Sequence, residues 1–307
     1  MGETDDALLR LAEIVRAEGY RFVTATPATH ARVNGRPGGD AGTTLRDAFG
    51  WSRAVPAEAL PPGIIGAMRR AGVLTEDGQA ARSAVRLSSL DGLLFVHSAF
   101  PTTKADSVFF GPDTYRFARA ILARLDRPVR RAVDIGAGAG PGAILVARAY
   151  PGAEVFAADI NPAALRMTRV NARLNGAAVT AVESNLLSAI PGVFDLIVSN
   201  PPYLIDPGAR AYRHGGGELG AGLSLAILDA ALGRLAPGGM LILYTGAAIV
   251  NGIDPFHVAA AARLEGSGCG WTYEEIDPDV FGEELEHGVY TSADRIAAVV
   301  LTVIRGE

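Results

Sequence analysis

The chain has 307 residues, 49% of them hydrophobic and 20% charged, which is typical of a globular protein large enough for two domains. Cys269 is the single cysteine and the five histidines show no ligand spacing, so we expect neither a disulfide framework nor a metal site. Residues 1–125 hold 15 Lys and Arg against 13 Asp and Glu, whereas the remainder holds 13 against 20, and this acidic second part disfavours a long nucleic acid as partner.

The first residues of the chain do not resemble a targeting segment. Glu3, Asp5 and Asp6 give them the wrong charge for a secretory signal. The longest apolar runs, Met240–Tyr244 and Ala297–Ile304, are strand-sized and fall short of the roughly 20 residues that span a bilayer. We therefore expect a cytoplasmic protein without membrane contact.

Residues 1–110 predict a small accessory unit of helices and short strands. The expected elements are a helix over Ala7–Gly19, a loop over Thr26–Asp47, a helix over Ile64–Ala71, a turn at Thr75–Gly78, and strands over Ala84–Ser88 and Leu93–His97. The last two strands meet at Asp91-Gly92, which is a hairpin signal. A helix followed by a hairpin suggests a winged-helix-like α+β domain.

From about residue 112 the pattern changes to strands and helices in alternation. Strands are expected at Ala132–Ile135, Glu154–Ala158, Val179–Glu183, Leu196–Ser199, Met240–Tyr244, Trp271–Ile276 and Ala297–Ile304. Helices are expected at Asp113–Leu125, Pro141–Ala149, Pro162–Leu174, Leu223–Leu235 and Pro255–Leu264. This alternation predicts an α/β fold, with a doubly wound, mostly parallel seven-stranded sheet covered on both faces. No clear helix separates the last two strands, so we expect an antiparallel pair at one edge.

A glycine-rich turn joins the first of these strands to its helix. Asp134 lies one residue before the end of that strand, and Gly136, Gly138 and Gly140 follow at alternate positions. Glycines allow a sharp turn and a close approach of a ligand to the backbone. A tight strand-to-helix turn without a ligand is the plain alternative.

An acidic residue follows the next strand. Asp159 lies roughly 20 residues beyond the glycine loop, where a doubly wound nucleotide site has an acid that binds both ribose hydroxyls. Asp159 is also suited to capping the helix that opens at Pro162, although Asn161 can serve as that cap. These two features fit a nicotinamide enzyme as well.

The segment that distinguishes between the two classes is Asn200-Pro201-Pro202-Tyr203, directly after a strand. Its prolines remove two backbone donors and stiffen the loop. The Asn200 amide oxygen and the Pro201 carbonyl can accept both hydrogens of a planar NH2 group, and Tyr203 can stack on the group that carries it. These bonds would direct the nitrogen lone pair toward a sulfonium methyl, which needs in-line approach. A merely rigid loop would need neither the asparagine nor the tyrosine.

With these motifs in place, residues from about 110 to 305 resemble the class I S-adenosylmethionine-dependent methyltransferases with an NPPY motif. Within that class they are similar to release-factor glutamine N-methyltransferases and small-domain methyltransferases of ribosomal RNA. The matching segments, in order, are Phe110–Thr114, Asp134–Gly140, Asp159 and the tetrapeptide. The resemblance implies the cofactor S-adenosyl-L-methionine.

The resemblance also implies a role for each cofactor-binding position. Asp134 and the loop glycines would hold the methionine part of the cofactor, and Asp159 its ribose. Asn185 and Leu186 would contact adenine, with Asn185 in place of the usual acid. Asn200 is expected at both the cofactor and the methyl acceptor.

The expected function is therefore transfer of a methyl group to a planar NH2 nitrogen, of protein glutamine or a nucleobase. The alternatives are N-methylation of a small amine or guanidino metabolite, a cofactor-binding module without catalysis, and a dehydrogenase. Residues 1–110 are expected to recognise the substrate, and 111–307 to form the methyltransferase domain.

Two further segments each leave two interpretations open. The segment Tyr212–Glu218 is either a mobile lid or a solvated loop. The second segment is rich in acids: Asp277, Asp279, Glu283, Glu284 and Glu286. It is either solvated surface or an acidic lip that attracts a cationic amine.

Overall fold

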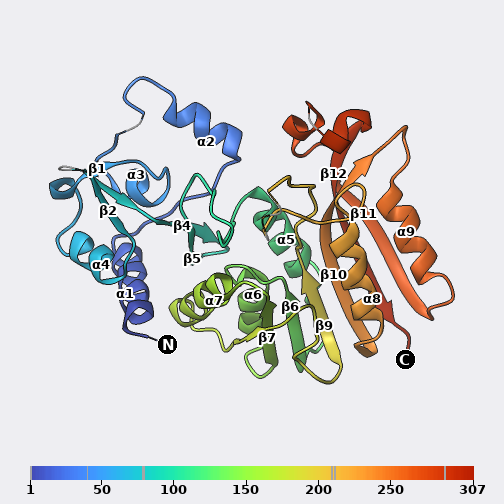
Figure 1. Ribbon diagram of the computed structural model, residues 1–307. Helices are drawn as coiled ribbons and strands as arrows, with labels where there is room; N and C mark the ends of the chain where they lie inside the picture. Colours follow the sequence, from blue (N-terminus) through green and yellow to red (C-terminus); the bar gives the residue numbers. More distant parts are fainter. Residues whose placement is uncertain (1, 40, 78–79, 209, 211, 287) are drawn as a thin grey trace.

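The computed structural model describes residues 2–39, 41–77, 80–208, 210, 212–286 and 288–307. Its larger unit is a seven-stranded sheet in the order β11-β12-β10-β9-β6-β7-β8 (Figure 1). The strands are β6 (Arg131–Ile135), β7 (Glu154–Asp159), β8 (Thr180–Glu183), β9 (Phe194–Ser199), β10 (Leu235–Ile249), β11 (Cys269–Asp277) and β12 (Arg295–Arg305). β12 runs antiparallel to both of its neighbours and the other pairings are parallel, which confirms the predicted fold class.

Helices cover both faces of this sheet, as its apolar strands require. One face carries α5 (Pro112–Leu122), α6 (Pro141–Ala149) and α7 (Pro162–Leu174); the other carries α8 (Gly222–Leu232) and α9 (Pro255–Leu264). Proline stands in the first turn of α5, α6, α7 and α9, where a missing N–H leaves no hydrogen bond unmade. None of the described helices is long and apolar enough to cross a membrane.

The predicted antiparallel edge pair is confirmed, with β11 at the edge beside β12. β10 extends well beyond the predicted Met240–Tyr244, because its second half continues to pair with β12 as far as Ile249 and Arg295. The apolar spacing of the sequence marks only the part of this strand that β9 also covers.

The smaller unit precedes the sheet. Its helices are α1 (Glu3–Ala17), α2 (Pro27–Asn34), α3 (Leu45–Phe49) and α4 (Ile64–Arg70), with a 3-10 turn at Ala57–Ala59. Its strands are β1 (Val55–Pro56), β2 (Leu74–Asp77), β3 (Ala80–Ser83), β4 (Val85–Leu90) and β5 (Leu93–Ser98). The predicted hairpin is confirmed as β4–β5, and Asp91 and Gly92 both adopt positive φ in its turn.

Two local predictions in this unit were wrong. Thr26–Asp47 is not all loop, because the Thr26 hydroxyl accepts from Thr29 N–H and Pro27 starts α2. Only His30 of α2 is buried, so the helix lacks the apolar stripe that would have revealed it. The expected turn at Thr75–Gly78 is strand as far as Asp77, whereas Gly78 lies outside the described residues.

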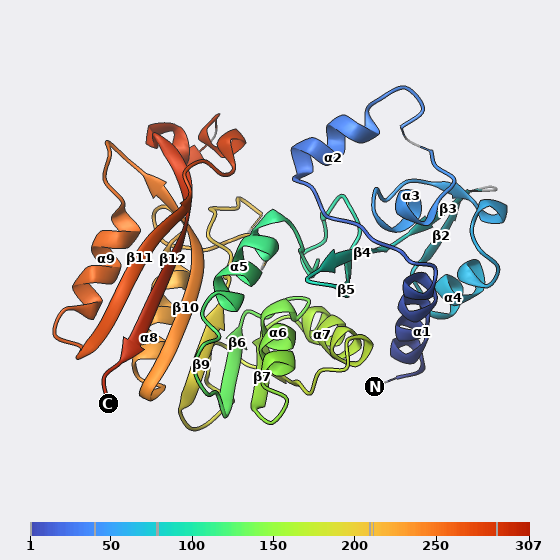
Figure 2. The ribbon, with the colours of Figure 1, turned by 180° about the vertical axis from the view of Figure 1, so that it is seen from behind.

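The two units share a packed interface, and α1 lies beside α7 when the molecule is seen from the front and from behind (Figure 2). Asn171 of α7 accepts from Val96 N–H at 2.7 Å and donates to the Val96 carbonyl at 2.9 Å. Asn175 makes the same two bonds with Leu94, at 3.2 and 2.8 Å. These side-chain amides thus form hydrogen bonds with backbone groups at the open edge of β5, as a further strand would.

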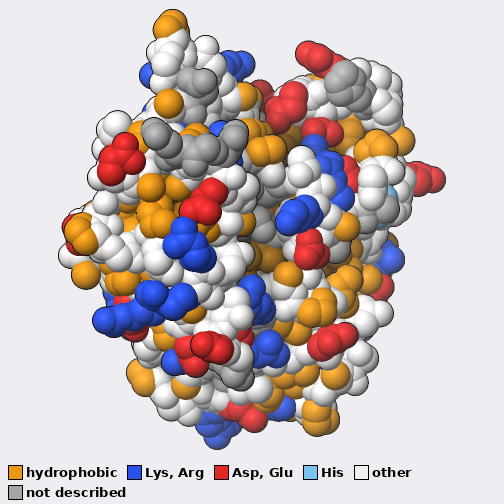
Figure 3. All heavy atoms as spheres, turned by 60° about the vertical axis from the view of Figure 1, so that its left-hand side comes forward, with side chains coloured by type: hydrophobic (Ala, Val, Ile, Leu, Met, Phe, Trp, Pro, Cys, Tyr) orange, Lys and Arg blue, Asp and Glu red, His pale blue; other side chains and the backbone are white. Residues whose placement is uncertain are grey.

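The surface shows no broad region of one charge on the face drawn in Figure 3, where basic and acidic side chains are interspersed. On this face the described residues therefore form no broad basic footprint of the kind that binds a long nucleic acid. The more informative feature is inside: the strand order reverses between β6 and β9, the point where doubly wound sheets bind ligands.

Candidate active site

A cavity of about 390 Å³ lies at the carboxyl ends of β6, β7 and β9. The predicted site residues that line it are Asp134, Gly136, Gly138, Asp159, Asn185, Leu186, Asn200, Pro201, Pro202 and Tyr203. Gly140 faces α7 instead, and a Cβ there would lie 2.9 Å from the Thr168 methyl. The fold thus gathers at one place residues that are up to 69 positions apart in the sequence, from Asp134 to Tyr203.

Asp134 fastens the glycine loop to the first turn of α6. Its side chain is 1% exposed, and Oδ2 accepts from Ala143 N–H at 2.9 Å. Burial is the main reason that the pKa of Asp134 rises to about 7, with the nearby Asp159 carboxylate as a smaller cause. A cationic group placed beside this carboxyl would favour its ionised form.

Gly136 and Gly138 form the floor of the cavity beside Asp134. Both adopt positive φ, and a Cβ at either position would meet nothing within 4 Å. Their backbone is therefore open to close approach by a ligand. At Gly140, by contrast, the missing side chain leaves room for α7.

Asp159 ties β7 to this loop. Oδ2 accepts from Gly138 N–H and Oδ1 from Asn161 N–H, both at 2.8 Å. The Asn161 side chain accepts from Ala163 N–H and is the cap of α7, so the capping role falls to Asn161. A carboxylate has about four acceptor positions. Two are taken, and the others remain for a ligand; burial raises the pKa of this group.

Asn185 and Leu186 line the cavity just after β8. The Ser184 hydroxyl donates to the Leu186 carbonyl at 2.9 Å, which holds this turn in place. Leu186 has a φ of 51°, in the left-handed region that few side chains adopt, so its backbone is set by this turn rather than by intrinsic preference.

Asn200 is the first residue after β9. The preceding Ser199 hydroxyl donates to the Ile135 carbonyl at 2.7 Å, which fixes the end of β9 against β6. The Asn200 side chain lines the cavity and has no hydrogen-bond partner among the residues that the structure describes. An amide group beside a cavity and without a partner is free to bind a ligand.

A glycine-rich run supports the tetrapeptide from behind. A Cβ on Gly215 would lie 2.7 Å from the Pro202 carbonyl oxygen, and one on Gly220 would lie 2.1 Å from that of Tyr203. Gly215 N–H also donates to the Leu204 carbonyl at 2.7 Å. These residues are small because two stretches of backbone pack directly against each other.

Tyr203 is held rigidly by a buried carboxylate. Its hydroxyl donates to Asp113 Oδ2 at 2.7 Å, and Tyr244 donates to Oδ1 at 2.6 Å. Arg116 adds an ion pair to Oδ1 at 3.1 Å. The ring packs so closely on Gly246 that a Cβ there would lie 2.2 Å away. The Tyr203 ring is therefore fixed in position at the cavity. Burial raises the pKa of Asp113 even though three groups donate to its carboxylate.

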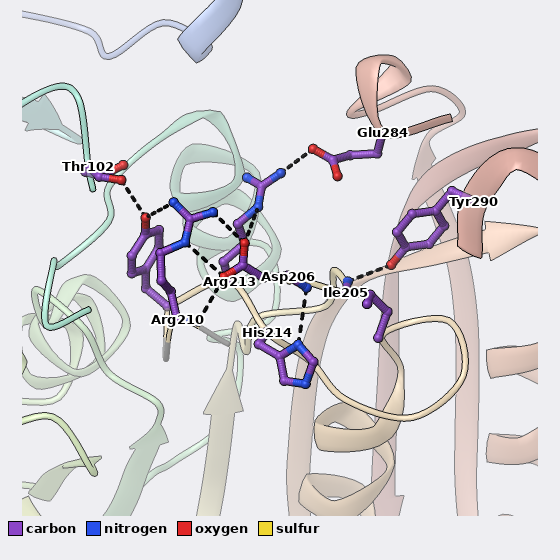
Figure 4. Close-up of polar contacts among 9 residues, drawn as sticks. Thr102, Ile205, Asp206, Arg210, Arg213, His214, Glu284 and Tyr290 are labelled. Atoms are coloured by element: carbon purple, nitrogen blue, oxygen red, sulfur yellow. Dashed lines mark hydrogen bonds and ion pairs between the residues drawn. The ribbon is translucent and has the colours of Figure 1, made fainter. Parts of the chain in front are cut away.

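A segment that we call the strap, residues 204–208, 210 and 212–214, crosses this end of the sheet (Figure 4). Arg210 and Arg213 both pair with Asp206, and the Arg210 bonds hold the pKa of Asp206 well below its usual range. The Tyr212 hydroxyl donates to the Thr102 carbonyl at 2.6 Å, and Arg213 pairs with Glu284. The strap is thus bonded to Thr102, which lines the cavity, and to Glu284.

The acidic segment after β11 is divided between paired and exposed side chains. Asp277 pairs with Arg116 at 2.7 Å, and Glu284 pairs with Arg213 of the strap. Asp279, Glu283 and Glu286 are exposed to solvent. The segment therefore contributes one structural anchor to the strap, and its other acids fit the solvated alternative.

The sequence analysis missed several lining residues. They are Pro27, Phe100, Phe109, Asp113, Arg210 and Phe281, whereas Tyr212 and Arg213 belong to the segment left open as a lid or a solvated loop. For Asp113 a signal existed, because it shares a helix face with the buried Phe117 and Ile121, where a carboxylate is out of place. The others are brought to the cavity by tertiary contacts that local patterns do not report.

Residues 104–248 match the family described as "Methyltransferase small domain". The chain is 36% identical over 176 residues to "Release factor glutamine methyltransferase" of Deinococcus radiodurans, an alignment that covers 53% of this chain and 58% of that protein. It is also 36% identical over 157 residues to "4-amino-L-phenylalanine/4-methylamino-L-phenylalanine methyltransferase" of Streptomyces pristinaespiralis, covering 44% of this chain and 52% of that one. The chain thus spans little more than half the length of these relatives.

Among solved structures, Trm5b of Pyrococcus abyssi is similar with a TM-score of 0.51 at 17% identity, covering 76% of this chain and 62% of that one. At this identity the likeness concerns the fold alone. It agrees with the seven-stranded α/β architecture found here.

Proposed function

We propose that the protein is an S-adenosylmethionine-dependent N-methyltransferase acting on a planar NH2 nitrogen, and the match of residues 104–248 to the methyltransferase small domain family supports this. The observation that carries this proposal is the Asn200 side chain, which has no partner among the described residues and lines the same cavity as the glycine loop and Asp159. A plain nucleotide-binding site needs no such group at the end of β9.

The residues present fit S-adenosyl-L-methionine. Asp134, with its pKa near 7, would meet the ammonium of the methionine part, and Gly136 and Gly138 leave the backbone open beside it. Asp159 has acceptor positions left for ribose hydroxyls, and Leu186 offers an apolar contact for adenine. When bound, this group supplies an electrophilic methyl on a sulfonium.

The chain's own residues orient the acceptor. The Asn200 amide oxygen and the Pro201 carbonyl would accept the two hydrogens of an NH2 group, leaving its lone pair directed toward the methyl. The two prolines keep this loop stiff, and the glycine-rich run holds it from behind. Tyr203, fixed by Asp113, would lie against the flat group that carries the nitrogen.

The acceptor classes that remain are a protein glutamine, a nucleobase, and a small amine or guanidino compound. The release-factor methyltransferase relatives support the first. One observation favours a small acceptor as a second candidate: Arg210, Tyr212 and Arg213 of the strap line the cavity, and bonds to Thr102 and Glu284 hold the strap in place there. The relative that methylates 4-amino-L-phenylalanine supports this candidate as well.

We further propose that residues 1–110 select the acceptor and 111–307 carry the transfer. Pro27 and Phe100 of the first part line the cavity together with the tetrapeptide. The hairpin that leads to Phe100 is fastened to α7 by Asn171 and Asn175, so its position relative to the cofactor residues is fixed.

The test is methyl transfer from labelled S-adenosylmethionine into fractionated cell extract, with Asn200→Ala as the inactive control. Label in a protein, RNA or small-molecule fraction that the variant fails to label supports the proposal and identifies the acceptor class. In parallel, thermal unfolding with S-adenosylhomocysteine and with NAD distinguishes the alternatives. Stabilisation by NAD alone would contradict the proposal in favour of a dehydrogenase, and cofactor binding without transfer would leave a binding module.

A further inference from the structure

A second, much smaller cavity lies in the first unit, next to the active-site cavity. It has a volume of about 10 Å³, roughly the room that one water-sized group needs. Pro27, Phe100, Thr102 and Phe109 line both cavities. The two cavities are therefore neighbours that share these four residues.

Arg86 of β4 lines the small cavity and is 4% exposed. Its Nε and Nη2 are buried without a hydrogen-bond partner, and no described carboxylate forms an ion pair with it. Burial lowers the pKa of Arg86 to about 10, so the guanidinium stays charged at neutral pH. Burying an unpaired cation is costly, and a protein keeps one only where something compensates the charge.

Among the groups around Arg86, the Phe22 ring, 5.6 Å from the guanidinium carbon, attracts the charge but supplies no anion. His97, its direct partner across the β4–β5 ladder, is neutral, because burial and the Arg86 charge hold its pKa well below the usual range. The His97 ring bonds to the Ser88 hydroxyl at 2.7 Å, and Ser88 in turn bonds to Thr24. Tyr20 uses its hydroxyl on the Leu87 carbonyl. These polar groups bond to one another, and none of them is bonded to Arg86, which has only its contact with the Phe22 ring.

The remaining titratable neighbours are His30 and Tyr115. The pKa of His30 is lowered to about 4, so this ring is neutral too. Tyr115 accepts from Thr24 N–H at 3.0 Å, and burial raises its pKa, so its hydroxyl stays protonated. No anionic partner of Arg86 is therefore found among the described residues. A water molecule in the cavity would accept a hydrogen bond but would not balance the charge.

From this unpaired guanidinium beside the acceptor cavity, we propose that Arg86 binds a carboxylate of the methyl acceptor, an inference that rests on the proposed function. We assign a carboxylate rather than a phosphate or sulfate because it is the smallest of these anionic groups, and the small cavity has room for only about one of its oxygen atoms. The planar guanidinium is the group best matched to a carboxylate. The acceptor is then a small molecule with an NH2 group at one end, toward Asn200, and a carboxylate at the other.

The matched control is Arg46. Its guanidinium lies 5.5 Å from the centre of the Phe22 ring and that of Arg86 lies 5.6 Å from the same ring, yet Arg46 is exposed and donates to the Arg21 carbonyl. Arg46→Met thus removes the same chemistry from the same aromatic partner, outside both cavities. Arg86→Met removes the buried charge.

The binding site is tested first with formate alone, the smallest carboxylate, against sodium chloride of equal ionic strength. The unfolding midpoint of the wild-type protein and of Arg46→Met should rise by about 2–4 °C at ten times the dissociation constant. That of Arg86→Met should not respond to formate. Sulfate should raise the midpoints of the wild type and of Arg86→Met by the same amount. A formate response in Arg86→Met, or none in the wild type, overturns the site. Saturable broadening of the 13C-formate resonance by the wild-type protein tests the same point should Arg86→Met fail to fold.

The source of the carboxylate is tested with the labelled product of the extract experiment. The expected product is a small molecule that binds an anion exchanger at neutral pH and is no longer retained after its carboxylate is esterified. A labelled protein, RNA or uncharged product overturns the assignment to the acceptor even if formate binds. The absence of any labelled product would contradict the proposed function, whereas the formate titration would still decide whether Arg86 binds carboxylates.

Discussion

Two charged side chains are buried near the cavity, and the chain surrounds them in opposite ways. Asp113, 6% exposed, accepts from Tyr203, Tyr244 and Arg116. Arg86, 4% exposed, has neither an ion-pair nor a hydrogen-bond partner among the described residues. A buried charge that is paired by other residues of the chain stabilises the fold, whereas a buried charge without such partners is available to bind a ligand.

Asp159 stands between these two extremes. Two backbone N–H groups bind its carboxylate, and the other acceptor positions remain beside the cavity. The number of partners that the chain supplies falls from Asp113 through Asp159 to Arg86. We therefore expect substitutions to affect stability most at Asp113 and ligand binding most at Asp159 and Arg86.

The largest effect on stability is expected from Asp113→Ala. The substitution leaves two buried tyrosine hydroxyls and Arg116 without their acceptor, so the free energy of unfolding should fall by about 3–5 kcal/mol. Urea unfolding measures it, with the exposed Asp126→Ala as control. Arg86→Met, by contrast, should cost no stability. A loss below about 1 kcal/mol for Asp113→Ala would remove the contrast between the two sites.

Asp134 extends the comparison to pH. Its pKa is raised to about 7, so the folded state binds this proton more tightly than the unfolded chain. Its stabilising contribution is complete below pH 4 and is lost as the pH rises through 7. Asp134→Asn does not titrate, so its stability relative to wild type should improve between pH 4 and 7 by on the order of 3 kcal/mol. Urea unfolding at several pH values measures this difference. If the carboxyl were ionised at every pH, the free energies of unfolding of the two proteins would change with pH in parallel, which would contradict the raised pKa.

For Asp159→Ala the expected effect is on cofactor affinity. Loss of a charged acceptor of ribose hydroxyls should weaken binding of S-adenosylhomocysteine by about 1.5–3 kcal/mol, which is tenfold or more. Titration calorimetry measures it, and Asp229→Ala on the outer face of α8 serves as control. Equal dissociation constants for Asp159→Ala and wild type would exclude Asp159 from the site.

The smallest effect is expected at the strap. Arg213 and Glu284 are partly exposed, so their coupling energy in a double-mutant cycle of Arg213→Gln and Glu284→Gln should be about 1 kcal/mol or less. A coupling above about 3 kcal/mol would place this pair with the buried charges instead.

Much of the fold could be predicted because its signals are local. Pro141, Pro162 and Pro255 mark helix starts that the structure reproduces to the residue, and apolar runs of strand length mark the sheet. The helix at Pro27–Asn34 was missed because its stability comes from a capped, proline-started first turn rather than from an apolar face. Local patterns do not show such a helix.

The candidate site was predictable only where one short segment contains the chemistry, as in the glycine loop and Asn200–Tyr203. Asp113 is 90 positions from Tyr203 and 131 from Tyr244, so its cluster exists only in the folded chain. The same holds for Arg86, which the sequence presents as one of many arginines. What distinguishes Arg86 is that none of the described residues forms a hydrogen bond or an ion pair with it, and this becomes visible only in the folded chain.

The central claim is that Asn200 positions the reacting nitrogen, and single-turnover methyl transfer by Asn200→Ala tests it most directly. The labelled fraction that the wild-type protein methylates is the acceptor, and cofactor affinity is measured on the same preparation. The account predicts cofactor binding within a few-fold of wild type and transfer slower by on the order of 100-fold, because the lost contact matters most as the methyl moves. Asn200→Asp, which keeps an acceptor oxygen, should retain more activity than the alanine variant. Transfer by Asn200→Ala at close to the wild-type rate would contradict the claim.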